Sequence, residues 1–433
     1  MFRIRRAKID DVGTLLKLAK MVHFINLPAD RDIITNKVMR SREGFLKALA
    51  LASGQPQPAD PEPELLTEAR RAASEPSVSA SHNGVASDAP ASVAGSAPPS
   101  RHPRAHQDGL VSLLQSSDLF MFVLEDLTVA DEKGNAGAVL GTSQIITRMG
   151  GPGRPNVSFR LSRKETFSST LQVGATHIVA KLHLDETGPT EIGGLILQPS
   201  YRGHKLRLGR LLSLVRFHVM GLYRPLFSER VLAEMMGPMT PDGRNTMWEY
   251  LGRRFINLTY AEADSFCQYS KEFMTSLLPH EEIYLTLLPP EARAVIAQVG
   301  PETVPARRML EKLGFAYRDH IDPFDGGPHL EAATDDISIV KNTRSGSGIT
   351  PVPQRQCDKH GLVSVLGSDG DFRAIETDFC VDRKGRVGLT KPQLKLLGVL
   401  DFANETGVQI GYTDMPTSQR VQPVRRRARS RTR

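Results

Sequence analysis

Residues 191–221 read EIGGLILQPSYRGHKLRLGRLLSLVRFHVMG, and this stretch decides the fold. Its apolar run at residues 192–197 predicts a strand. A proline-led turn follows, and from about Leu206 apolar side chains recur at helical spacing, which predicts a helix. A strand that runs into the start of a helix aims backbone N–H groups and the positive end of the helix dipole at one point. The stretch therefore predicts an anion site.

Basic residues and glycines crowd the turn between this strand and this helix. Cationic side chains beside a helix start suit a pyrophosphate group, whereas the alternative interpretation is a basic helix start on a solvated face. The residues that we expect to hold an anionic ligand here are Arg202, Gly203, His204, Gly209 and Arg210.

Strands and helices alternate on either side of this stretch. Residues 2–4 alternate as a strand, and Asp10 is expected to cap a helix with one apolar face. Residues 120–147 read as strand, polar loop and strand, which predicts a hairpin. A further strand at 230–237 precedes a helix that we expect to end near Gly252. The pattern predicts an α+β protein, in which helices flank a mixed or antiparallel sheet.

Composition divides the chain into four parts. Residues 1–52 and 109–340 carry the strand and helix patterns, while residues 53–108 are rich in Ala, Ser and Pro and are expected to be a disordered insertion. Residues 341–415 read as short strands and predict a small β domain. Residues 416–433 are expected to be a disordered, arginine-rich tail. The similar segments WEYLGRRF and LEKLGFAY further suggest two related half-units.

Charge and cysteine content exclude several classes of function. The net charge of the 433 residues is +7, but the last fourteen residues hold seven arginines and no acid, so nucleic acid is not an expected partner of the body. No apolar run approaches a membrane span of ~20 residues, and the N-terminus does not resemble a signal peptide, which predicts a cytoplasmic protein. Three widely spaced cysteines indicate neither a disulfide framework nor a metal site.

The order of these elements resembles the GNAT acyl-CoA transferases, in which the corresponding turn binds the pyrophosphate of coenzyme A. Here Arg202 and Gly209 lie seven residues apart, so the turn is two residues longer than the usual form. The segments EIGGLILQPSYRG, VLAEMMG, WEYLGRRF and FDGGP resemble, in order, those of the arginine N-succinyltransferase family.

This resemblance implies transfer of succinyl from succinyl-CoA to the α-amino group of L-arginine or ornithine in arginine catabolism, with succinyl-CoA as a co-substrate and no permanently bound cofactor. The position that matches the family's succinyl-CoA contact is Leu195, and a backbone N–H of the strand that carries Leu195, Ile196 and Leu197 is expected to meet the oxyanion. The family's proton-donor histidine falls at Gly300, which has no side chain to donate.

Amine acylation needs a proton acceptor, and the candidates are Glu234 and Glu191, since acids in apolar strands are costly unless they are partnered or functional. His320 and His329 are further acid or base candidates. Guanidinium recognition needs carboxylates, which Asp322 and Asp325 offer, although acids before Gly-Gly or Pro also cap turns.

Arg253 is a candidate for the succinyl carboxylate. Two other interpretations of the chain stay open. One is a GNAT-like N-acyltransferase with another acyl-CoA or amine. The other is a non-catalytic partner subunit in a homo- or hetero-oligomer.

Overall fold

The computed structural model describes residues 1–21, 27–54, 118–130, 136–267, 270–399 and 408–415. The predicted insertion, apart from residues 53–54, and the predicted tail lie outside these ranges. The helices are α1 (Val12–Met21), α2 (Arg31–Ala52), α5 (Leu208–Leu222), α6 (Arg253–Phe255), α7 (Tyr260–Cys267), α8 (Glu272–Leu277), α9 (Pro290–Val295), α10 (Val304–Lys312), α11 (Ser338–Asn342) and α12 (Lys391–Leu397).

The strands are β1 (Phe2–Arg6), β2 (Leu119–Ala130), β3 (Ala136–Ile146), β4 (Asn156–Ser168), β5 (Val173–Asp185), β6 (Thr190–Leu197), β7 (Arg230–Glu234), β8 (Ile283–Tyr284), β9 (Ala316–Ile321), β10 (Pro328–Ala333), β11 (Thr343–Gly346), β12 (Gly348–Pro351), β13 (Lys359–Leu366), β14 (Phe372–Val381), β15 (Arg386–Leu389) and β16 (Gln409–Asp414). The predicted strand, turn and helix of residues 191–221 are β6, a short 3₁₀ turn and α5.

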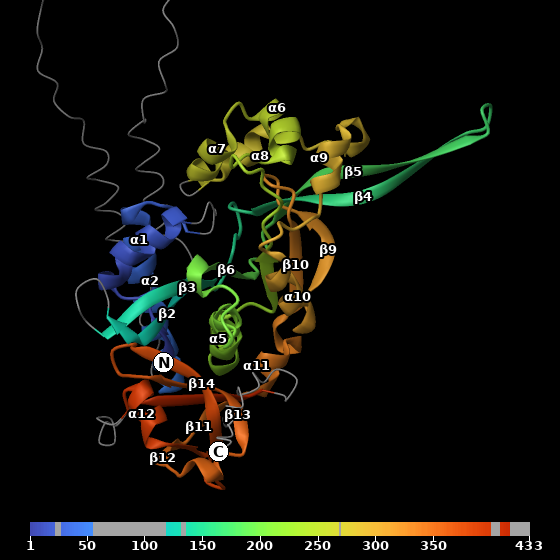
Figure 1. Cartoon of the computed structure of the whole chain (residues 1–433). Coiled ribbons are helices and arrows are strands. Elements are labelled where there is room, and N and C mark those ends of the chain that lie inside the picture. Colours follow the sequence, from blue (N-terminus) through green and yellow to red (C-terminus); the bar gives the residue numbers. More distant parts are fainter. Residues whose placement is uncertain (22–26, 55–117, 131–135, 268–269, 400–407, 416–433) are drawn as a thin grey trace, which may run out of the picture.

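One long sheet runs through the described chain in the order β11-β16-β13-β14-β1-β2-β3-β6-β7-β10-β9-β4-β5-β8. Neighbours on this path are antiparallel except β6 and β7, which are parallel. Helices α1 and α2 lie beside β2 and β3, near the middle of the sheet. Helices α6 to α9 gather near β4 and β5, at one end of the sheet (Figure 1). The structure is therefore the predicted α+β fold with a mixed sheet and flanking helices.

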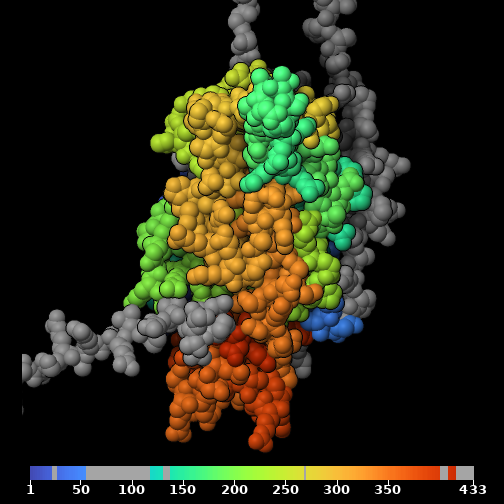
Figure 2. All heavy atoms as spheres, turned by 90° about the vertical axis from the view of Figure 1, so that its right-hand side faces the viewer, coloured from blue at the N-terminus to red at the C-terminus, as the bar shows by residue number. Residues whose placement is uncertain are grey.

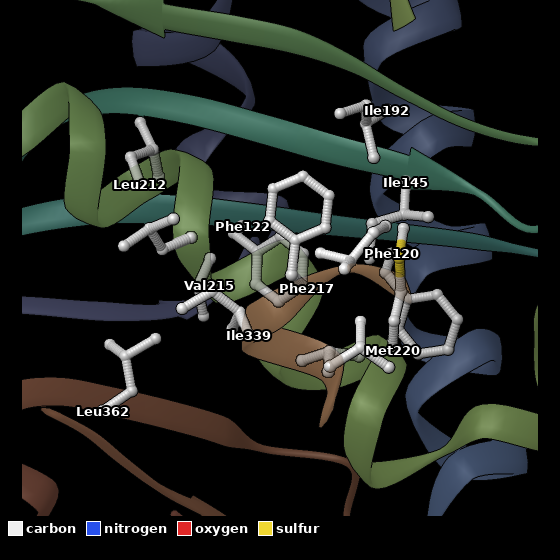
Figure 3. Close-up of a cluster of buried hydrophobic side chains, with 14 of the residues drawn as sticks. Phe120, Phe122, Ile145, Ile192, Leu212, Val215, Phe217, Met220, Ile339 and Leu362 are labelled. Atoms are coloured by element: carbon white, nitrogen blue, oxygen red, sulfur yellow. The ribbon is translucent and has the colours of Figure 1, made fainter. Parts of the chain in front are cut away.

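Helix α5 is the centre of the main core. Its residues from Leu211 to Met220 are buried, because α5 lies between the main sheet and the C-terminal strands. Figure 3 shows Phe217 and Met220 of this helix beside Phe120 and Ile145 of the sheet. The buried His218 of this helix has hydrogen-bond partners for both ring nitrogens, which lie 2.6 Å from Thr413 Oγ1 and 2.7 Å from Ser364 Oγ. The apolar spacing that predicted this helix thus reflects burial on most sides.

The C-terminal strands have an apolar cluster of their own around Val363, Phe379 and Leu397. They also join the main sheet, because β14 pairs with β1 through Ile4 opposite Ala374. Figure 2 shows these strands at the end of the molecule opposite to helices α6 to α9. The division of the chain at residue 341 into separate domains stays a prediction.

Three local predictions can be compared with the structure. Asp10 lies in the 3₁₀ turn Ile9–Asp11 that precedes α1, and the Asp11 carboxylate accepts the Lys8 N–H at 2.7 Å. A capping role for Asp10 stays a prediction. Gly252 lies near the end of its helix, as predicted: it is the last residue of the π-helical turn Trp248–Gly252, which α6 extends to Phe255, and its Cα lies against the Trp248 ring. The segments around Gly252 and Gly314 also differ, because the first continues into further helices and the second, with φ of +106°, leads into β9. Their similarity therefore marks no repeated unit.

None of the helices in the described ranges is both long and apolar enough to cross a membrane.

Candidate active site

The parallel strands β6 and β7 separate soon after they meet. They pair only through Thr190 with Val231 and Glu191 with Leu232, whereas β6 runs on to Leu197 and remains paired with β3 on its other side. Beyond Glu191, no strand in the described chain pairs with the β7-facing edge of β6. The backbone groups of Leu195 to Leu197 on that edge are therefore available to a ligand.

A bulge in β6 adjoins this open edge. Gly194 has φ of +57°, and a Cβ there would lie 2.8 Å from the Gln144 side chain, so the position requires glycine. Arg216, buried in α5, donates from Nη1 to the Gly193 carbonyl at 3.4 Å. Residues of α5 thus hold the bulge of β6 in place.

The turn after β6 keeps several backbone amides open. Gly203 has φ of +72° with free space beside it, and Arg207 precedes α5 with φ of +50°. The first amides of α5, at Leu208 and Gly209, lack an acceptor within their helix, as at any helix start. Arg202 is exposed and lies 2.8 Å from Glu302. This geometry suits an anion, and the binding roles of Arg202, Gly203 and Gly209 stay predictions.

Two basic residues of the turn have contacts of their own. His204 accepts the Leu206 N–H at Nδ1 and packs edge-on against the Phe2 ring. Arg210 donates to Glu376 Oε1 at 2.8 Å and contacts Met415, so its guanidinium binds the C-terminal strands. The guanidinium of Arg210 is therefore not free for a pyrophosphate, which corrects its predicted role, whereas the binding role of His204 stays a prediction.

The catalytic candidates Glu191 and Glu234 lie on the same face of the sheet where β6 and β7 separate. Glu191 pairs with Leu232, two residues before Glu234, so both carboxylates project from that face. His329 of β10 stands directly opposite Glu234, with Nε2 3.9 Å from Glu234 Oε1. Asn156 of β4 donates to Glu234 at 2.9 Å and accepts from Lys271 at 3.2 Å. Strands far apart in the sequence thus build one polar group.

Glu191 and Glu234 have opposite electrostatic environments. Burial, and then the charge of Glu234, raises the pKa of Glu191 to about 8. Burial would also raise the pKa of Glu234, but His329, Lys271 and the hydrogen bond from Asn156 lower it below its usual range. At neutral pH Glu191 is therefore a neutral acid and Glu234 a carboxylate. Glu191 Oε2 is buried and has no hydrogen-bond partner among the described residues.

Further acids surround this pair. One side-chain ligand atom from each of Glu234, Asp322 and His329 lies within 4.8 Å of the others. Burial, and then Asp325, raises the pKa of Asp322 to about 7, and burial, and then Asp322, raises that of Asp264 to about 7. Lys37 and Lys271 lower the pKa values of neighbouring acids, but they do not offset burial and the mutual repulsion of the carboxylates at Glu191, Asp264 and Asp322. A cation placed here would be stabilised by these acids.

The structure places Asp325 and Arg253 outside ligand-binding roles. Asp325 is 3% exposed and accepts the N–H groups of Gly237 at 2.9 Å and Gly327 at 2.7 Å. Its carboxylate is thus used to tie a turn, as acids before Gly-Gly often are. Arg253 bonds to Glu249, one turn away on the same helix, and is 41% exposed. Neither prediction is supported by the geometry.

His320 does not line the group formed by Glu191 and Glu234. It lines a small adjoining pocket, to which Asn156 and His329 also belong. Its Nδ1 lies 3.0 Å from Ser158 Oγ and its ring 4.6 Å from that of His183. Burial, and then His183, lowers the pKa of His320 to about 4. A catalytic role for His320 is therefore not supported, although His329 lines both this pocket and the acid cluster.

Comparison with known proteins identifies the family of the chain. Residues 110–339 match the family model described as arginine N-succinyltransferase beta subunit. The chain belongs to the arginine N-succinyltransferase family. Proteins named arginine N-succinyltransferase from Yersinia pestis strain Pestoides F and Yersinia enterocolitica are 35% identical over 65% of this chain and 39% identical over 61%, and the matches cover 79% and 74% of those proteins.

A solved structure supports the fold. Subunit AI of arginine/ornithine succinyltransferase from Pseudomonas aeruginosa superposes with a TM-score of 0.64 at 23% identity, over 96% of this chain and 98% of that one. The fold predicted from the sequence, and the prediction of an acyltransferase of the arginine N-succinyltransferase family, are thus confirmed.

Within this arginine N-succinyltransferase fold, Gly300 lies in the loop before α10, beside Met236 and Gly237, which follow β7. Its N–H donates to the Met236 carbonyl at 3.0 Å, and a Cβ at this position would lie 3.2 Å from the Gly237 carbonyl oxygen. The position where the resemblance placed a proton donor therefore adjoins the strand of Glu234, but this chain has no side chain there.

Sequence reasoning gave too little weight to several members of the site. His329 appeared only as an alternative, and Asn156, Asp264 and Lys271 were not singled out at all. Their positions depend on the pairing of β7 with β10 and of β4 with β9. The available signal was a polar residue in an otherwise apolar strand, at His329 in PHLEAA and Asn156 in NVSF.

We expect the substitution Glu191→Gln to stabilise the fold as the pH rises. The folded pKa of Glu191 lies above its ordinary value of 4.5, so the favourable protonation is complete below pH 4.5 and is lost as the pH rises through about 8. Gln keeps the neutral form at every pH. The free energy of unfolding of the variant should match wild type at pH 4.5. At pH 9 it should exceed wild type by up to about 5 kcal/mol in urea titrations, because a pKa difference between about 8 and 4.5 corresponds to about 1.4 kcal/mol per pKa unit.

Glu186→Gln, at an exposed position, is the matched control and should show no such difference. An equal effect of Glu191→Gln at both pH values would contradict a neutral Glu191.

Proposed function

We propose that the chain transfers the succinyl group of succinyl-CoA to the α-amino group of L-arginine. The observation that carries this proposal is the buried acid cluster beside the separated strands β6 and β7. The acids Glu191, Glu234, Asp264 and Asp322 outnumber the two lysines, Lys37 and Lys271, whose charges act on them, and this surplus of acids suits a substrate with both an ammonium and a guanidinium group. The names of the relatives, arginine N-succinyltransferase, support the same substrate pair.

Two different carboxyl groups supply the proton transfers. Glu234, with its lowered pKa, accepts a proton from the substrate ammonium group, and the neutral amine then attacks the thioester carbonyl carbon. Glu191, with its raised pKa, donates to the departing thiolate. The nitrogen loses two protons in the reaction: Glu234 takes the first and releases it to solvent, and the second restores the proton that Glu191 has given to the thiol. Enzymes often use two carboxyl groups in this way: one environment raises the pKa of the acid, and another lowers the pKa of the base.

The open edge of β6 binds the acyl donor in this proposal. A backbone N–H between Leu195 and Leu197 donates to the carbonyl oxygen, whose negative charge grows in the tetrahedral intermediate. The amides at Gly203, Leu208 and Gly209 then hold the pyrophosphate of coenzyme A at the start of α5. Glu191 at the beginning of β6 would therefore lie near the thioester of succinyl-CoA, and the turn after β6 would lie near its pyrophosphate.

A thiol-release assay tests the function. Purified protein with succinyl-CoA and arginine should release coenzyme A, and acetyl-CoA should be a poor donor. The same assay with ornithine distinguishes the two amines named for the Pseudomonas relative. Absence of arginine-dependent release with every donor would refute the proposal and favour a non-catalytic subunit.

Removal of cluster charge should weaken arginine binding. Asp264→Asn and Asp322→Asn each delete one acid that would face the cationic substrate, so we expect KM for arginine to rise about 10-fold or more with a smaller change in KM for succinyl-CoA. Asp242→Asn is the control, because Asp242 is exposed and bonds to Arg244 away from the cluster. An unchanged KM for arginine in both variants would place its cationic groups elsewhere.

A further inference from the structure

Two buried polar atoms in the acid cluster have no hydrogen-bond partner among the described residues. One is Glu191 Oε2, and the other is Nε2 of His329. The His329 side chain is only 3% exposed, and its Nε2 lies 3.9 Å from Glu234 Oε1, which is too far for a hydrogen bond. A buried nitrogen or oxygen without a partner costs free energy unless water or an ion satisfies it. These atoms therefore indicate that a ligand completes the cluster.

Three segments of the chain bring one potential metal ligand each to this place. Glu234 ends β7, Asp322 follows β9, and His329 near the start of β10 stands opposite Glu234. One side-chain atom from each lies within 4.8 Å of the other two. Zinc binds nitrogen and oxygen ligands at about 2.0–2.2 Å, so neighbouring ligand atoms in a tetrahedral site are about 3.4 Å apart. A small rotation of these side chains therefore lets all three bind one ion.

Both carboxylates keep an oxygen for such an ion. Asp322 Oδ1 accepts the N–H groups of Phe324 at 2.7 Å and Asp325 at 3.1 Å, and no group in the described ranges donates to its Oδ2. Asn156 donates to Glu234 Oε1 at 2.9 Å, which likewise leaves Oε2 without a donor from the described part of the chain. Hydrogen bonds of this kind fix the orientation of the residues that bind a metal.

The ligand types and the charges around them favour Zn²⁺. Imidazole nitrogen is a ligand of transition metals such as zinc, whereas Mg²⁺ and Ca²⁺ prefer oxygen ligands. Among the ionisable neighbours, Glu191 and Asp264 favour an added cation because each loses its proton more easily beside one, whereas Lys37 and Lys271 oppose it. The four acids of the cluster outnumber these two lysines, so a divalent cation is favoured on balance.

We propose that Glu234, Asp322 and His329 form a zinc site that inhibits the enzyme. The inhibitory effect rests on the proposed function, whereas the binding site does not. Zn²⁺ occupies the carboxylates that would face arginine, and a zinc-bound Glu234 cannot accept the proton of the substrate ammonium group. Zinc and arginine therefore exclude each other, and by thermodynamic linkage each weakens the binding of the other by the same factor.

Isothermal titration calorimetry of the full chain with ZnCl₂, without substrates, tests the site. Wild type should bind zinc with a Kd below about 100 µM. His329→Gln should raise this Kd at least about 10-fold, because a metal ligand is lost. Asp322→Asn should weaken zinc binding as well, and it decides the test if circular dichroism shows that His329→Gln is misfolded. His320→Gln is the matched control and should leave the Kd unchanged, since His320 lines the adjoining pocket outside the acid cluster.

Competition with arginine tests the inhibition. Saturating arginine should raise the apparent Kd for zinc. In steady-state assays zinc should raise KM for arginine without lowering kcat, followed by the thioester absorbance of succinyl-CoA because zinc also binds the released thiol. Zinc bound through His329 in a protein without acyl transfer would support the site and refute only the proposed function.

Three results would overturn the zinc proposal. The first is an absence of zinc binding at about 1 mM metal. The second is zinc binding that both His329→Gln and Asp322→Asn leave unchanged, since the ion would then lie elsewhere. The third is zinc bound at His329 that neither weakens in arginine nor raises KM in an active enzyme, since the site would then not inhibit.

Discussion

Replacement of Glu234 by Gln is expected to lower kcat/KM for arginine by about 10²–10³-fold, chiefly through kcat. Gln has the same shape and still accepts the hydrogen bond from Asn156, so the fold and the ligand pocket should persist. What is lost is the carboxylate that takes the ammonium proton. Steady-state thiol release at pH 7.5, with both substrates varied in turn, measures the effect.

Glu331→Gln is the matched control for this prediction. Glu331 projects from the same face of β10 as His329 but bonds to Arg230 at 2.6 Å, outside the acid cluster. Its replacement should change kcat less than threefold. A loss that appears only in KM for arginine would instead make Glu234 a binding group, and wild-type activity in Glu234→Gln would remove it from the mechanism.

His329 provides a second measurement on the same carboxylate. After burial, which raises the pKa of Glu234, the neighbouring His329 is the strongest influence that lowers it. The rate should fall as the pH drops through this pKa, because the base becomes protonated. In His329→Gln that acidic limb should therefore move to higher pH, a change that loss of packing alone would not produce.

Local sequence signals were sufficient for the central elements of the fold. The apolar run of β6, the glycine turn and the spacing of α5 lie within 31 consecutive residues, and the hairpin of β2 and β3 is equally local. Such patterns are decided by neighbouring residues, so they can be interpreted without the rest of the chain. The resemblance to a known family added the function, which no periodicity could supply.

The acid cluster could be predicted only in part, because it is assembled by long-range pairing. Glu234 and His329 are 95 positions apart in the sequence. They lie opposite each other because β10 pairs antiparallel with β7. Arg210 seemed free for a ligand, yet Glu376 of the C-terminal strands binds it. Asp325 and Asp322 were equivalent in sequence, and in the structure both accept backbone N–H groups of the turn. Asp325 uses both carboxylate oxygens to do so, whereas Asp322 accepts Phe324 and Asp325 N–H through Oδ1 alone.

Gly327→Ala is expected to destabilise the protein by at least about 4 kcal/mol, a large effect for a single methyl group. A Cβ at this position would lie 1.8 Å from the Met235 carbonyl oxygen and 2.7 Å from the Gly237 nitrogen. Both are backbone atoms that cannot move without separating β7 from β10. Urea unfolding followed by circular dichroism, or the soluble yield if the variant does not fold, measures the loss.

Two other glycines calibrate this prediction. Gly151→Ala has open space and an ordinary φ, so its free energy of unfolding should stay within about 0.5 kcal/mol of wild type. Gly300→Ala meets the Gly237 carbonyl oxygen at 3.2 Å and should lie between the two. A wild-type urea midpoint for Gly327→Ala would contradict the close packing of these strands. Because Gly327 also donates to Asp325, whose neighbour Asp322 belongs to the acid cluster, the same contact that closes the sheet holds the proposed arginine site in shape.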